Sequence, residues 1–195
     1  MSDGALRPAA GRLLVATPVI DDPNFDRTVV LLFEHDDAVG SAGVVLNRPT
    51  DVPVADAIDG WGVAAAAPGV VFVGGPVADT AAIGVARRSS IPVAVEPWVR
   101  GAMQELFDDL VVVDLAVDAG PVLPAVVELR IWTGYAGWGA GQLRGEIEAG
   151  AWWVVEADPS DVFCRNPAGL WRDVLTRQGG RFRVWAHAPD DPQVN

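Results

Sequence analysis

A glycine-rich segment that also carries large aromatic side chains constrains the fold of this chain more than any other feature. Residues 133–143 read Thr-Gly-Tyr-Ala-Gly-Trp-Gly-Ala-Gly-Gln-Leu and include Trp138 and the single tyrosine of the chain, Tyr135. An apolar, β-branched run, 126–133, precedes the segment, and a helix-like run, 142–149, follows it. Glycine permits positive φ angles and the close approach of another backbone or a ligand. Because bulky aromatic rings are untypical of a flexible linker, the segment predicts an ordered turn between a strand and a helix.

Two interpretations of this turn stay open. In the first, Tyr135 and Trp138 pack against a sheet and the glycines only redirect the chain. In the second, free backbone N–H groups at the start of the following helix bind an anion, with Gly137 and Gln142 beside it. A dinucleotide site is not indicated, because residues 137–141 lack the Gly-x-Gly-x-x-Gly spacing. Packing is favoured, and Tyr135, Gly137, Trp138 and Gln142 are the ligand-binding candidates of this segment.

The charge of the chain argues against a nucleic-acid partner. Its 14 basic and 26 acidic residues give a formal net charge of −12 and a pI near 4.4. Such a surface repels a polyanion unless cations cluster on it, and the nearest approach to a cluster is small: Arg172, Arg177, Arg181 and Arg183. We therefore expect no direct nucleic-acid binding, and an unknown protein or small molecule as the partner.

Composition also excludes several kinds of chemistry. The chain has no lysine, which excludes a lysine Schiff base and the lysine of a P-loop. A single cysteine, Cys164, excludes an intramolecular disulfide and a cysteine-rich zinc site. We predict no cofactor and no metal site. No apolar run is long enough to span a membrane and no signal peptide is apparent, so the expected location is the cytoplasm.

Hydrophobic periodicity predicts alternating strands and helices. Residues 27–34 are apolar on both alternating faces, which indicates a strand inside a sheet, and 42–47 most simply pair with them as an antiparallel hairpin around a turn at 35–41. Further strands are predicted at 12–17, 70–73, 83–87, 92–96, 110–115, 126–133 and 152–155. Helical segments are predicted at 51–59, 103–108, 120–125, 142–149, 158–163 and 167–177.

The hairpin separates two groups of polar side chains that are candidates for binding. Asn47 is expected near Arg27 at the open end, with Asn24 in the turn before it, and we expect Arg27 to be paired or hydrogen-bonded there. Glu34 and His35 lie at the other end, beside the predicted turn. About seven residues of strand separate the two ends by roughly 23 Å. One small site cannot contain both groups unless the sheet curls strongly.

The pair Glu34-His35 raises the possibility of a general base or a metal ligand. The chain contains two histidines, His35 and His187, without the spacing of a metal-binding helix. Neighbouring residues of a strand point to opposite faces, so Glu34 and His35 cooperate directly only if a bulge intervenes. We favour a structural interpretation, in which these two side chains at the strand end form hydrogen bonds with backbone groups of the turn. The alternative is a hydrolase that uses Glu34 or His35 on a ligand held at the glycine-rich turn, and no catalytic residue is assigned.

One ordered series of motifs runs through almost the whole chain. It comprises Leu14-Val15-Ala16-Thr17-Pro18, residues 22–30, Glu34-His35, residues 43–50, Gly74-Gly75-Pro76-Val77, residues 134–138, Gly141-Gln142-Leu143, Glu146, Ala151-Trp152, Asp158 and Trp171. This series resembles the AlgH/YqgE family of bacterial proteins. The resemblance implies an α+β fold in which a mixed β-sheet curls into a pseudo-barrel with flanking helices. It also implies a single compact domain over residues 12–187, with flexible ends at 1–11 and 188–195.

The resemblance implies a function only in outline. One branch of the family is described as a regulator of transcription in exopolysaccharide production, and most members have no assigned activity. Since no nucleophile–base pair or metal set is apparent either, we predict a non-enzymatic regulatory or binding protein. Phe33 stands where many relatives carry a cysteine, and residues 82–85 replace a stretch that often holds a histidine. A mechanism that needs either residue does not transfer to this chain.

Overall fold

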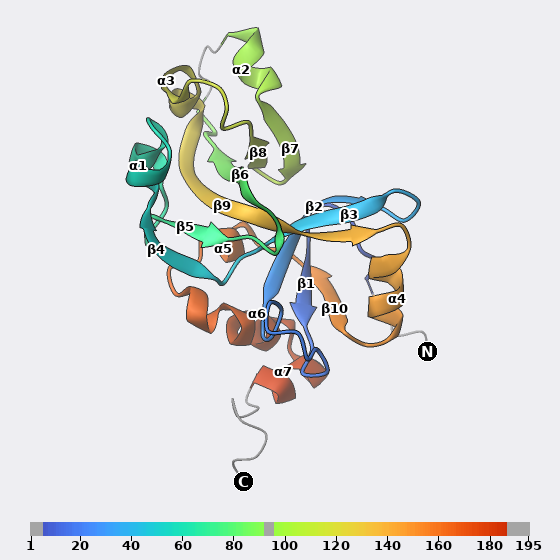
Figure 1. The fold of residues 1–195 in the computed structure, drawn as a ribbon. Coiled ribbons are helices and arrows are strands. Elements are labelled where there is room, and N and C mark those ends of the chain that lie inside the picture. The colour runs from blue at the N-terminus through green and yellow to red at the C-terminus, as the bar shows by residue number, and fades with distance from the viewer. Residues whose placement is uncertain (1–5, 92–95, 187–195) are drawn as a thin grey trace.

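The computed structural model describes residues 6–91 and 96–186, in which ten strands form one curled sheet (Figure 1). The sheet order is β10-β1-β2-β3-β9-β6-β8-β7, and β4 pairs with β5, which in turn lies beside β9. The strands are β1 (Arg12–Ala16), β2 (Val29–Asp36), β3 (Gly40–Val45), β4 (Pro49–Pro53), β5 (Val70–Val73), β6 (Val77–Arg88), β7 (Met103–Phe107), β8 (Leu110–Val113), β9 (Val126–Gly139) and β10 (Trp152–Glu156). The sheet is mixed because β5 runs parallel to β9. The predicted α+β fold with a curled, mixed sheet and flanking helices is confirmed.

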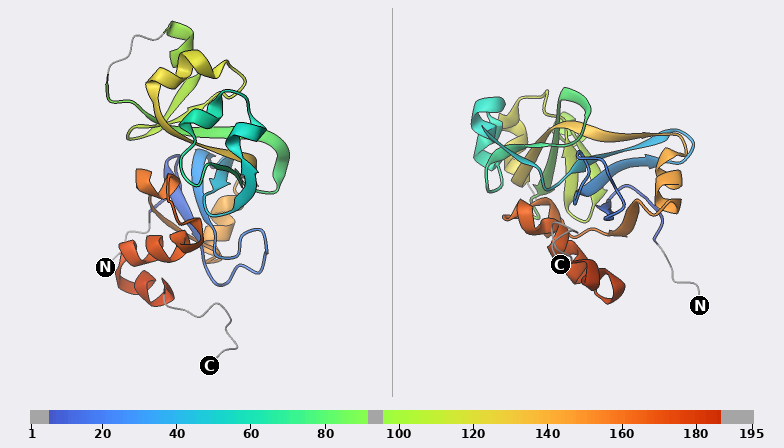
Figure 2. Two further views of the ribbon diagram at one scale, coloured as in Figure 1. Left: turned by 90° about the vertical axis from the view of Figure 1, so that its left-hand side faces the viewer. Right: turned by 60° about the horizontal axis from the view of Figure 1, so that its bottom comes forward.

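Short helices flank this sheet. They are α1 (Val54–Ala57), η1 (Trp61–Ala64), α2 (Pro97–Gly101), α3 (Ala119–Val122), η2 (Leu123–Ala125), α4 (Gln142–Glu148), α5 (Pro159–Val162), η3 (Pro167–Gly169), α6 (Leu170–Gln178) and α7 (Gly180–Ala186). Figure 2 shows α6 and α7 together on one side of the sheet. Leu170 and Val174 of α6 belong to the same core as Leu13 and Leu31 of the strands beneath. Among the helices of residues 6–91 and 96–186, none has the length and apolar character needed to cross a bilayer.

Strand β9 joins the two halves of the sheet. Its first half pairs with β6 and β5, and its last residues pair with β3, where Gly139 faces Gly40. The prediction of a turn over 134–139 is therefore wrong, because this segment continues the strand and the chain turns only at residues 140–141. The glycines serve a close backbone crossing. Gly134 has a φ of +67°, and a Cβ on Gly74 would lie 2.2 Å from its carbonyl oxygen.

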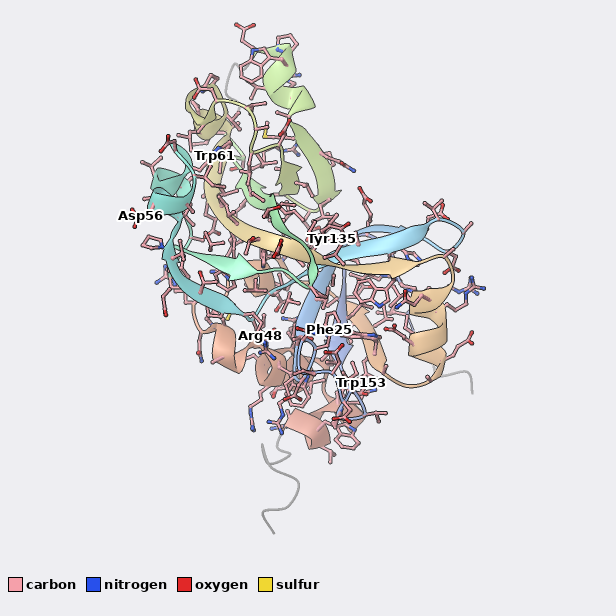
Figure 3. All side chains as sticks on the ribbon, viewed as in Figure 1. Phe25, Arg48, Asp56, Trp61, Tyr135 and Trp153 are labelled. Atoms are coloured by element: carbon pink, nitrogen blue, oxygen red, sulfur yellow. The ribbon has the colours of Figure 1, made fainter. Side chains whose placement is uncertain are left out.

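The core lies on both faces of the sheet, as the apolar pattern of the second strand predicts. Leu31 packs into the cluster beneath α6, whereas Val30 packs into a second cluster that includes Trp138 and Trp152. A third cluster fills the other half of the molecule around Trp61, which Figure 3 labels. Burial of apolar side chains is the dominant favourable term in folding. Strand β2, which is buried on both faces, therefore joins the core beneath α6 to the core around Trp138 and Trp152.

The predicted hairpin is confirmed, with two differences in detail. β2 and β3 are antiparallel and pair Val30 with Val45. Both strands lie two residues closer to the turn than predicted, since β2 spans Val29–Asp36 and β3 spans Gly40–Val45, so that the turn covers only residues 37–39. A register shift between Leu32 and the second residue after it marks a bulge in β2.

Two helical predictions are wrong, and one strand cannot be compared. The predicted helix over 51–59 forms only as the four residues of α1, because residues 49–53 pair with β5 as a strand. Residues 103–107 form strand β7 along β8 instead of a helical turn. Segments this short have no clear hydrophobic period, so they suit either an edge strand or a helical turn, and pairing with a neighbouring strand decides between the two. Most of the predicted strand 92–96 lies outside the described residues.

Candidate functional site

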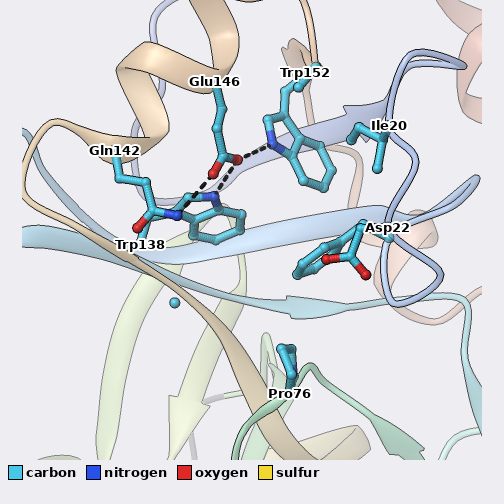
Figure 4. A pocket seen from close by; sticks show the side chains of 10 residues that line it. Ile20, Asp22, Pro76, Trp138, Gln142, Glu146 and Trp152 are labelled. Carbon is cyan, nitrogen blue, oxygen red and sulfur yellow. Dashed lines mark hydrogen bonds between the residues drawn. The ribbon is translucent and has the colours of Figure 1, made fainter.

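A pocket of about 260 Å³ opens where the loop of residues 17–28, the end of β9, α4 and the start of β10 meet (Figure 4). Three of its walls are aromatic rings, and we call it the aromatic pocket. It is lined by Ile20, Asp22, Phe25, Pro76, Gly137, Trp138, Gln142, Glu146, Ala151 and Trp152. This volume is slightly below the range of about 300–1,000 Å³ that is typical of small-molecule sites.

The three rings of the aromatic pocket contact one another. Phe25 stacks on Trp138 with a centroid distance of 6.3 Å. Trp152 meets Phe25 edge to face at 5.5 Å and Trp138 edge to face at 5.9 Å. Stacked and edge-to-face pairs add roughly 0.5–1.5 kcal/mol each beyond the burial of their surface. The rings therefore form an ordered group rather than three independent side chains.

The carboxylate of Glu146 holds the two indoles in place. Its Oε2 accepts hydrogen bonds from Nε1 of Trp138 at 2.9 Å and from Nε1 of Trp152 at 2.8 Å. Its Oε1 accepts a bond from Nε2 of Gln142 at 2.9 Å, one helical turn earlier on α4, and the side-chain oxygen of Gln142 accepts the N–H of Gly139 at 3.0 Å. Figure 4 shows the bonds of Glu146 to the two indoles and to Gln142 on one side of the pocket. The helix that follows β9 thus fixes both tryptophan side chains.

A second carboxylate lies on the loop side of the pocket. Oδ1 of Asp22 accepts the backbone N–H of Asn24 at 2.9 Å and its side-chain amide at 3.0 Å. The backbone N–H of Phe25 bonds to the carbonyl oxygen of Asp22 at 2.9 Å. These local bonds shape the turn, as aspartate and asparagine commonly do. The lining contains two acidic residues and no basic residue, so its formal charge is negative.

The structure brings together three of the four candidates from the glycine-rich segment. Gly137, Trp138 and Gln142 line the aromatic pocket. Tyr135 does not, since residues 135 and 138 point to opposite faces of a strand, and its ring packs half-buried against the core beneath α6. The packing interpretation holds for Trp138, which is 6% exposed. Tyr135 is only half-buried, which falls short of the expected burial.

The aromatic pocket also contains residues that sequence reasoning did not propose for binding. Phe25, Glu146 and Trp152 lie within the motifs of the ordered series, but nothing in those motifs indicates that they meet. Asn24 was proposed, and it lies exposed beside the pocket, bonded to Asp22. One signal in the sequence was available: Glu146 lies on a helix between two strands that carry Trp138 and Trp152. A buried indole N–H requires an acceptor, so this carboxylate could have been predicted to bind both indoles.

Arg27 and Asn47 lie on the other side of the loop, outside the aromatic pocket. Nδ2 of Asn47 donates to the carbonyl oxygen of Arg27 at 2.9 Å, which brings the two residues together as expected. The guanidinium of Arg27 lies over the ring of Trp171, 5.4 Å from its centroid. Trp171 was not among the predicted neighbours of Arg27, because its helix lies far along the chain.

Glu34 and His35 occupy the far end of the hairpin. Glu34 is exposed, whereas the His35 side chain is 13% exposed and its Nδ1 lies 2.8 Å from Oγ of Ser41. Nε2 of His35 lies 3.9 Å from Oδ1 of Asp37. Ser41 is paired with both His35 and Trp138, so His35 lies in the same cross-strand row as the aromatic pocket, two strands away. Neither Glu34 nor His35 lines the pocket.

The described part of the chain contains no group of three or more His, Cys, Asp or Glu side chains arranged to hold a metal ion. The two carboxylates of the aromatic pocket are occupied differently: Glu146 accepts from two indoles and Asp22 from the backbone of its own turn. The chemistry that the pocket offers is therefore recognition by aromatic faces and negative charge.

Comparison with known proteins finds matches over nearly the whole chain. A family model described as AlgH-like (DUF179) matches residues 13–183. A UPF0301 protein of Streptomyces avermitilis is 50% identical over 190 residues, covering 95% of this chain and 94% of that protein. A UPF0301 protein of Mycobacterium avium is 40% identical over 195 residues, covering 100% and 95%.

Two solved structures share the fold. A crystal structure of a Corynebacterium diphtheriae protein has 32% sequence identity and a TM-score of 0.85, and the match covers 94% of each chain. The solution structure of the AlgH protein from Pseudomonas aeruginosa has 26% identity and a TM-score of 0.64, with 95% of this chain and 98% of that chain covered. The curled sheet and its helices are therefore shared with these proteins.

Proposed function

Because the chain belongs to the AlgH-like family, and because that family suggests no reaction, we propose a function from the geometry of the aromatic pocket: a non-enzymatic regulatory protein that binds a small organic ammonium cation. The observation that carries the proposal is the meeting of three aromatic rings with a lining that has two carboxylates and no basic residue. Ring faces attract cations electrostatically, and aromatic cages bind quaternary ammonium groups.

The electrostatics of the lining favour a cation over a neutral ring. Asp22 lies at the loop side and Glu146 at the indoles, so a cation in the pocket would be near two negative charges. A neutral aromatic ligand would gain stacking but nothing from these charges, and an anion would be repelled. The small volume of the pocket, about 260 Å³, suits an ammonium group of a few carbon atoms.

The hydrogen bonds of Glu146 support a binding role over a catalytic one. A carboxylate that accepts from two indoles and an amide is a poor general base, since most of its roughly four lone-pair sites are already engaged. These bonds instead hold the two tryptophan rings in position before any ligand binds. A site organised in advance loses less conformational entropy on binding.

One observation favours a second function, a hydrolase. Nδ1 of His35 lies within hydrogen-bond distance of Oγ of Ser41, as a base and a nucleophile would. The arrangement differs from a working pair in one respect, because Ser41 is 9% exposed and lies on a strand between two others. Robust hydrolysis of generic ester or phosphate substrates, abolished by His35→Ala, would favour the hydrolase and overturn the non-enzymatic proposal.

Tetramethylammonium and tert-butanol test the binding proposal directly, because they have nearly the same shape and differ in charge. We expect tetramethylammonium to perturb tryptophan fluorescence saturably and to bind at least about tenfold more tightly, as a cation–π interaction of up to about 2 kcal/mol implies. Isothermal titration should return the same dissociation constant. Equal affinity for the two probes, or no saturable change with the cation, would contradict the proposal.

Two substitutions locate the binding. Phe25→Leu keeps apolar bulk but removes one ring, and Asp22→Asn keeps the oxygen that accepts from the turn but removes the charge. Both should weaken tetramethylammonium binding. Asp21→Asn is the matched control, since the neighbouring carboxylate does not line the pocket. If Asp21→Asn weakens binding as much as Asp22→Asn, the effect is one of overall charge and the pocket is not the site.

The regulatory part of the proposal extends to transcription through a protein partner. The net charge of −12 opposes contact with DNA phosphates, so a ligand-dependent change would be transmitted by association with another protein. Association of the purified protein with a candidate transcription component, measured with and without the bound cation, tests this step. A complex of the same affinity in both conditions would contradict it.

A further inference from the structure

A second cleft, of about 310 Å³, lies on the opposite side of the loop from the aromatic pocket. It opens between residues 26–27, the connection from β3 to β4, and the start of α6. We call it the arginine cleft. Its lining consists of Asp26, Arg27, Asn47, Arg48, Pro49, Ala168, Trp171 and Arg172. Three arginines and one aspartate give this lining a positive formal charge, in a chain whose net charge is −12.

The position of Arg27 is set by surrounding groups. Its φ of +49° is in the left-handed region, which is uncommon for a residue with a side chain and persists only where neighbours hold it. Asn47, which is 6% exposed, provides that hold: Nδ2 donates to the Arg27 carbonyl and Oδ1 accepts the N–H of Val29 at 3.1 Å. A buried asparagine thus maintains a strained arginine at the wall of the cleft.

The direction of the Arg27 side chain is also set. Its guanidinium lies 5.4 Å from the ring centroid of Trp171, and the indole N–H of Trp171 donates to the carbonyl oxygen of Ala16 at 2.9 Å. Trp171 is therefore anchored to the first strand of the sheet. A guanidinium stacked on a fixed ring loses less freedom when it binds a ligand.

Two further guanidiniums come from separate elements. Arg48, which Figure 3 labels, precedes β4, and its Nη2 donates to the backbone carbonyl of Asp26 at 2.5 Å. Arg172 is on α6, and its Nη1 donates to the carbonyl oxygen of Ala186 at 3.1 Å. These bonds to carbonyl oxygens orient the two side chains at the cleft. The fold thus gathers three arginines that are far apart in the sequence.

We propose that the arginine cleft binds the phosphate groups of a small phosphorylated molecule. Guanidinium groups present planar, paired N–H donors that match phosphate oxygens, and they remain charged at all physiological pH values. A volume of about 310 Å³ accommodates a diphosphate or a small phosphate ester. A duplex nucleic acid is disfavoured because the chain as a whole carries a net charge of −12.

This site is independent of the aromatic pocket. The lining residues of the two cavities do not overlap, and the loop presents Phe25 to one and Asp26 and Arg27 to the other. Failure of tetramethylammonium to bind would leave the arginine cleft unaffected as a proposal.

Pyrophosphate is the probe for the test, by isothermal titration of the full chain at several salt concentrations. We expect saturable binding that weakens as salt increases, and competition by inorganic phosphate. Adenosine diphosphate is the second arm: tighter binding than pyrophosphate indicates a nucleotide-like ligand, whereas weaker binding indicates that the phosphates alone are recognised. Absence of saturable pyrophosphate binding by the folded protein would overturn the proposal.

Charge-neutralising substitutions then locate the site. Arg48→Gln and Arg172→Gln should each weaken pyrophosphate binding by about tenfold or more, as expected for the loss of a charge-assisted hydrogen bond. Arg27→Gln should do the same, and far-UV circular dichroism checks that its strained backbone still folds. Arg100→Gln is the matched control, because this exposed arginine of α2 lies outside the cleft.

Two outcomes of this comparison would count against the cleft. If Arg48→Gln and Arg172→Gln bind pyrophosphate as the unaltered protein does, the phosphate is bound elsewhere. If Arg100→Gln weakens binding equally, the interaction reflects overall charge alone. Tight binding of duplex DNA that is lost in Arg48→Gln would identify the cleft as part of a nucleic-acid surface and overturn the assignment to a small molecule.

Discussion

Replacing Glu146 with alanine removes the acceptor that Trp138 and Trp152 share. The two indoles are 6% and 3% exposed, so water cannot fully replace the lost carboxylate oxygen. Leaving a buried donor without a partner costs about 1–3 kcal/mol, and two such donors give about 2–6 kcal/mol. The bond from Gln142 adds little because that side chain is exposed. Since the free energy of unfolding of a domain is about 5–15 kcal/mol, we expect Glu146→Ala to lower it by a large fraction.

Urea unfolding followed by far-UV circular dichroism measures this loss without depending on the fluorescence of the affected tryptophans. Glu148→Ala is the matched control, because it removes an exposed carboxylate from the same helix and should change stability by less than about 0.5 kcal/mol. Glu146→Gln keeps one oxygen between the indoles and should lose less stability than Glu146→Ala. Both Glu146 variants should also weaken tetramethylammonium binding, since the rings are no longer held.

A loss below about 1 kcal/mol for Glu146→Ala would refute the reasoning. It would mean that the indole N–H groups find other acceptors or are accessible to water. A loss as large for Glu148→Ala would show instead that the helix is sensitive to any change of charge. In the first case the tryptophan rings would not depend on the carboxylate for their position, and in the second the loss could not be assigned to the indole hydrogen bonds.

Three further predictions concern other parts of the chain. Gly134→Val should destabilise the fold by several kcal/mol, because the φ of Gly134 is +67° and a Cβ there would lie 2.7 Å from a backbone oxygen of Gly75. Gly145→Ala, in helix α4, should instead stabilise the fold by about 0.5–1 kcal/mol. Urea unfolding of both variants measures the contrast, and similar changes in the free energy of unfolding would contradict it. Asp158→Ala should cost about 1 kcal/mol at pH 7, because its side chain caps α5. Hydrogen bonds from Ser160 lower the pKa of Asp158 below its ordinary 3.8, so this stabilisation is fully present above pH 3.8 and is lost as the pH falls through the lowered value. A stability difference between Asp158→Ala and the unaltered protein that does not shrink as the pH is lowered below 3.8 would contradict this. Duplex DNA should bind weakly or not at all in a salt titration, and tight binding with a log–log slope of about −0.9 per phosphate would show this expectation to be wrong.

Local sequence patterns predicted the elements whose form depends on neighbours in the chain. The β2–β3 hairpin follows from two apolar runs around a polar turn, and α4 begins at Gln142 after a glycine with positive φ. Asn47 was placed beside Arg27 correctly, because the register of a short hairpin brings its open ends together. In these places burial, turn chemistry and pairing all act within about twenty residues.

The predictions that are wrong concern segments whose form is decided by pairing with another strand. Residues 134–139 have the composition of a turn, but they pair with β3 and cross closely over Gly74 and Gly75, and these contacts make them a strand. Residues 103–107 become a strand because β8 offers a pairing edge. Strand formation depends on neighbouring strands more than helix formation depends on neighbouring helices, so such segments are ambiguous in isolation.

The candidate site shows the same division. Trp138 and Gln142 could be named from the chain alone, because an aromatic residue among glycines and a helix start are local signals. Phe25 and Trp152 join them only because the sheet order places the loop before β2 and the start of β10 at the end of β9. The three arginines of the second cleft likewise meet only in the folded chain. The composition and periodicity of a sequence describe each segment's preference, whereas long-range burial and strand pairing select which segments become neighbours.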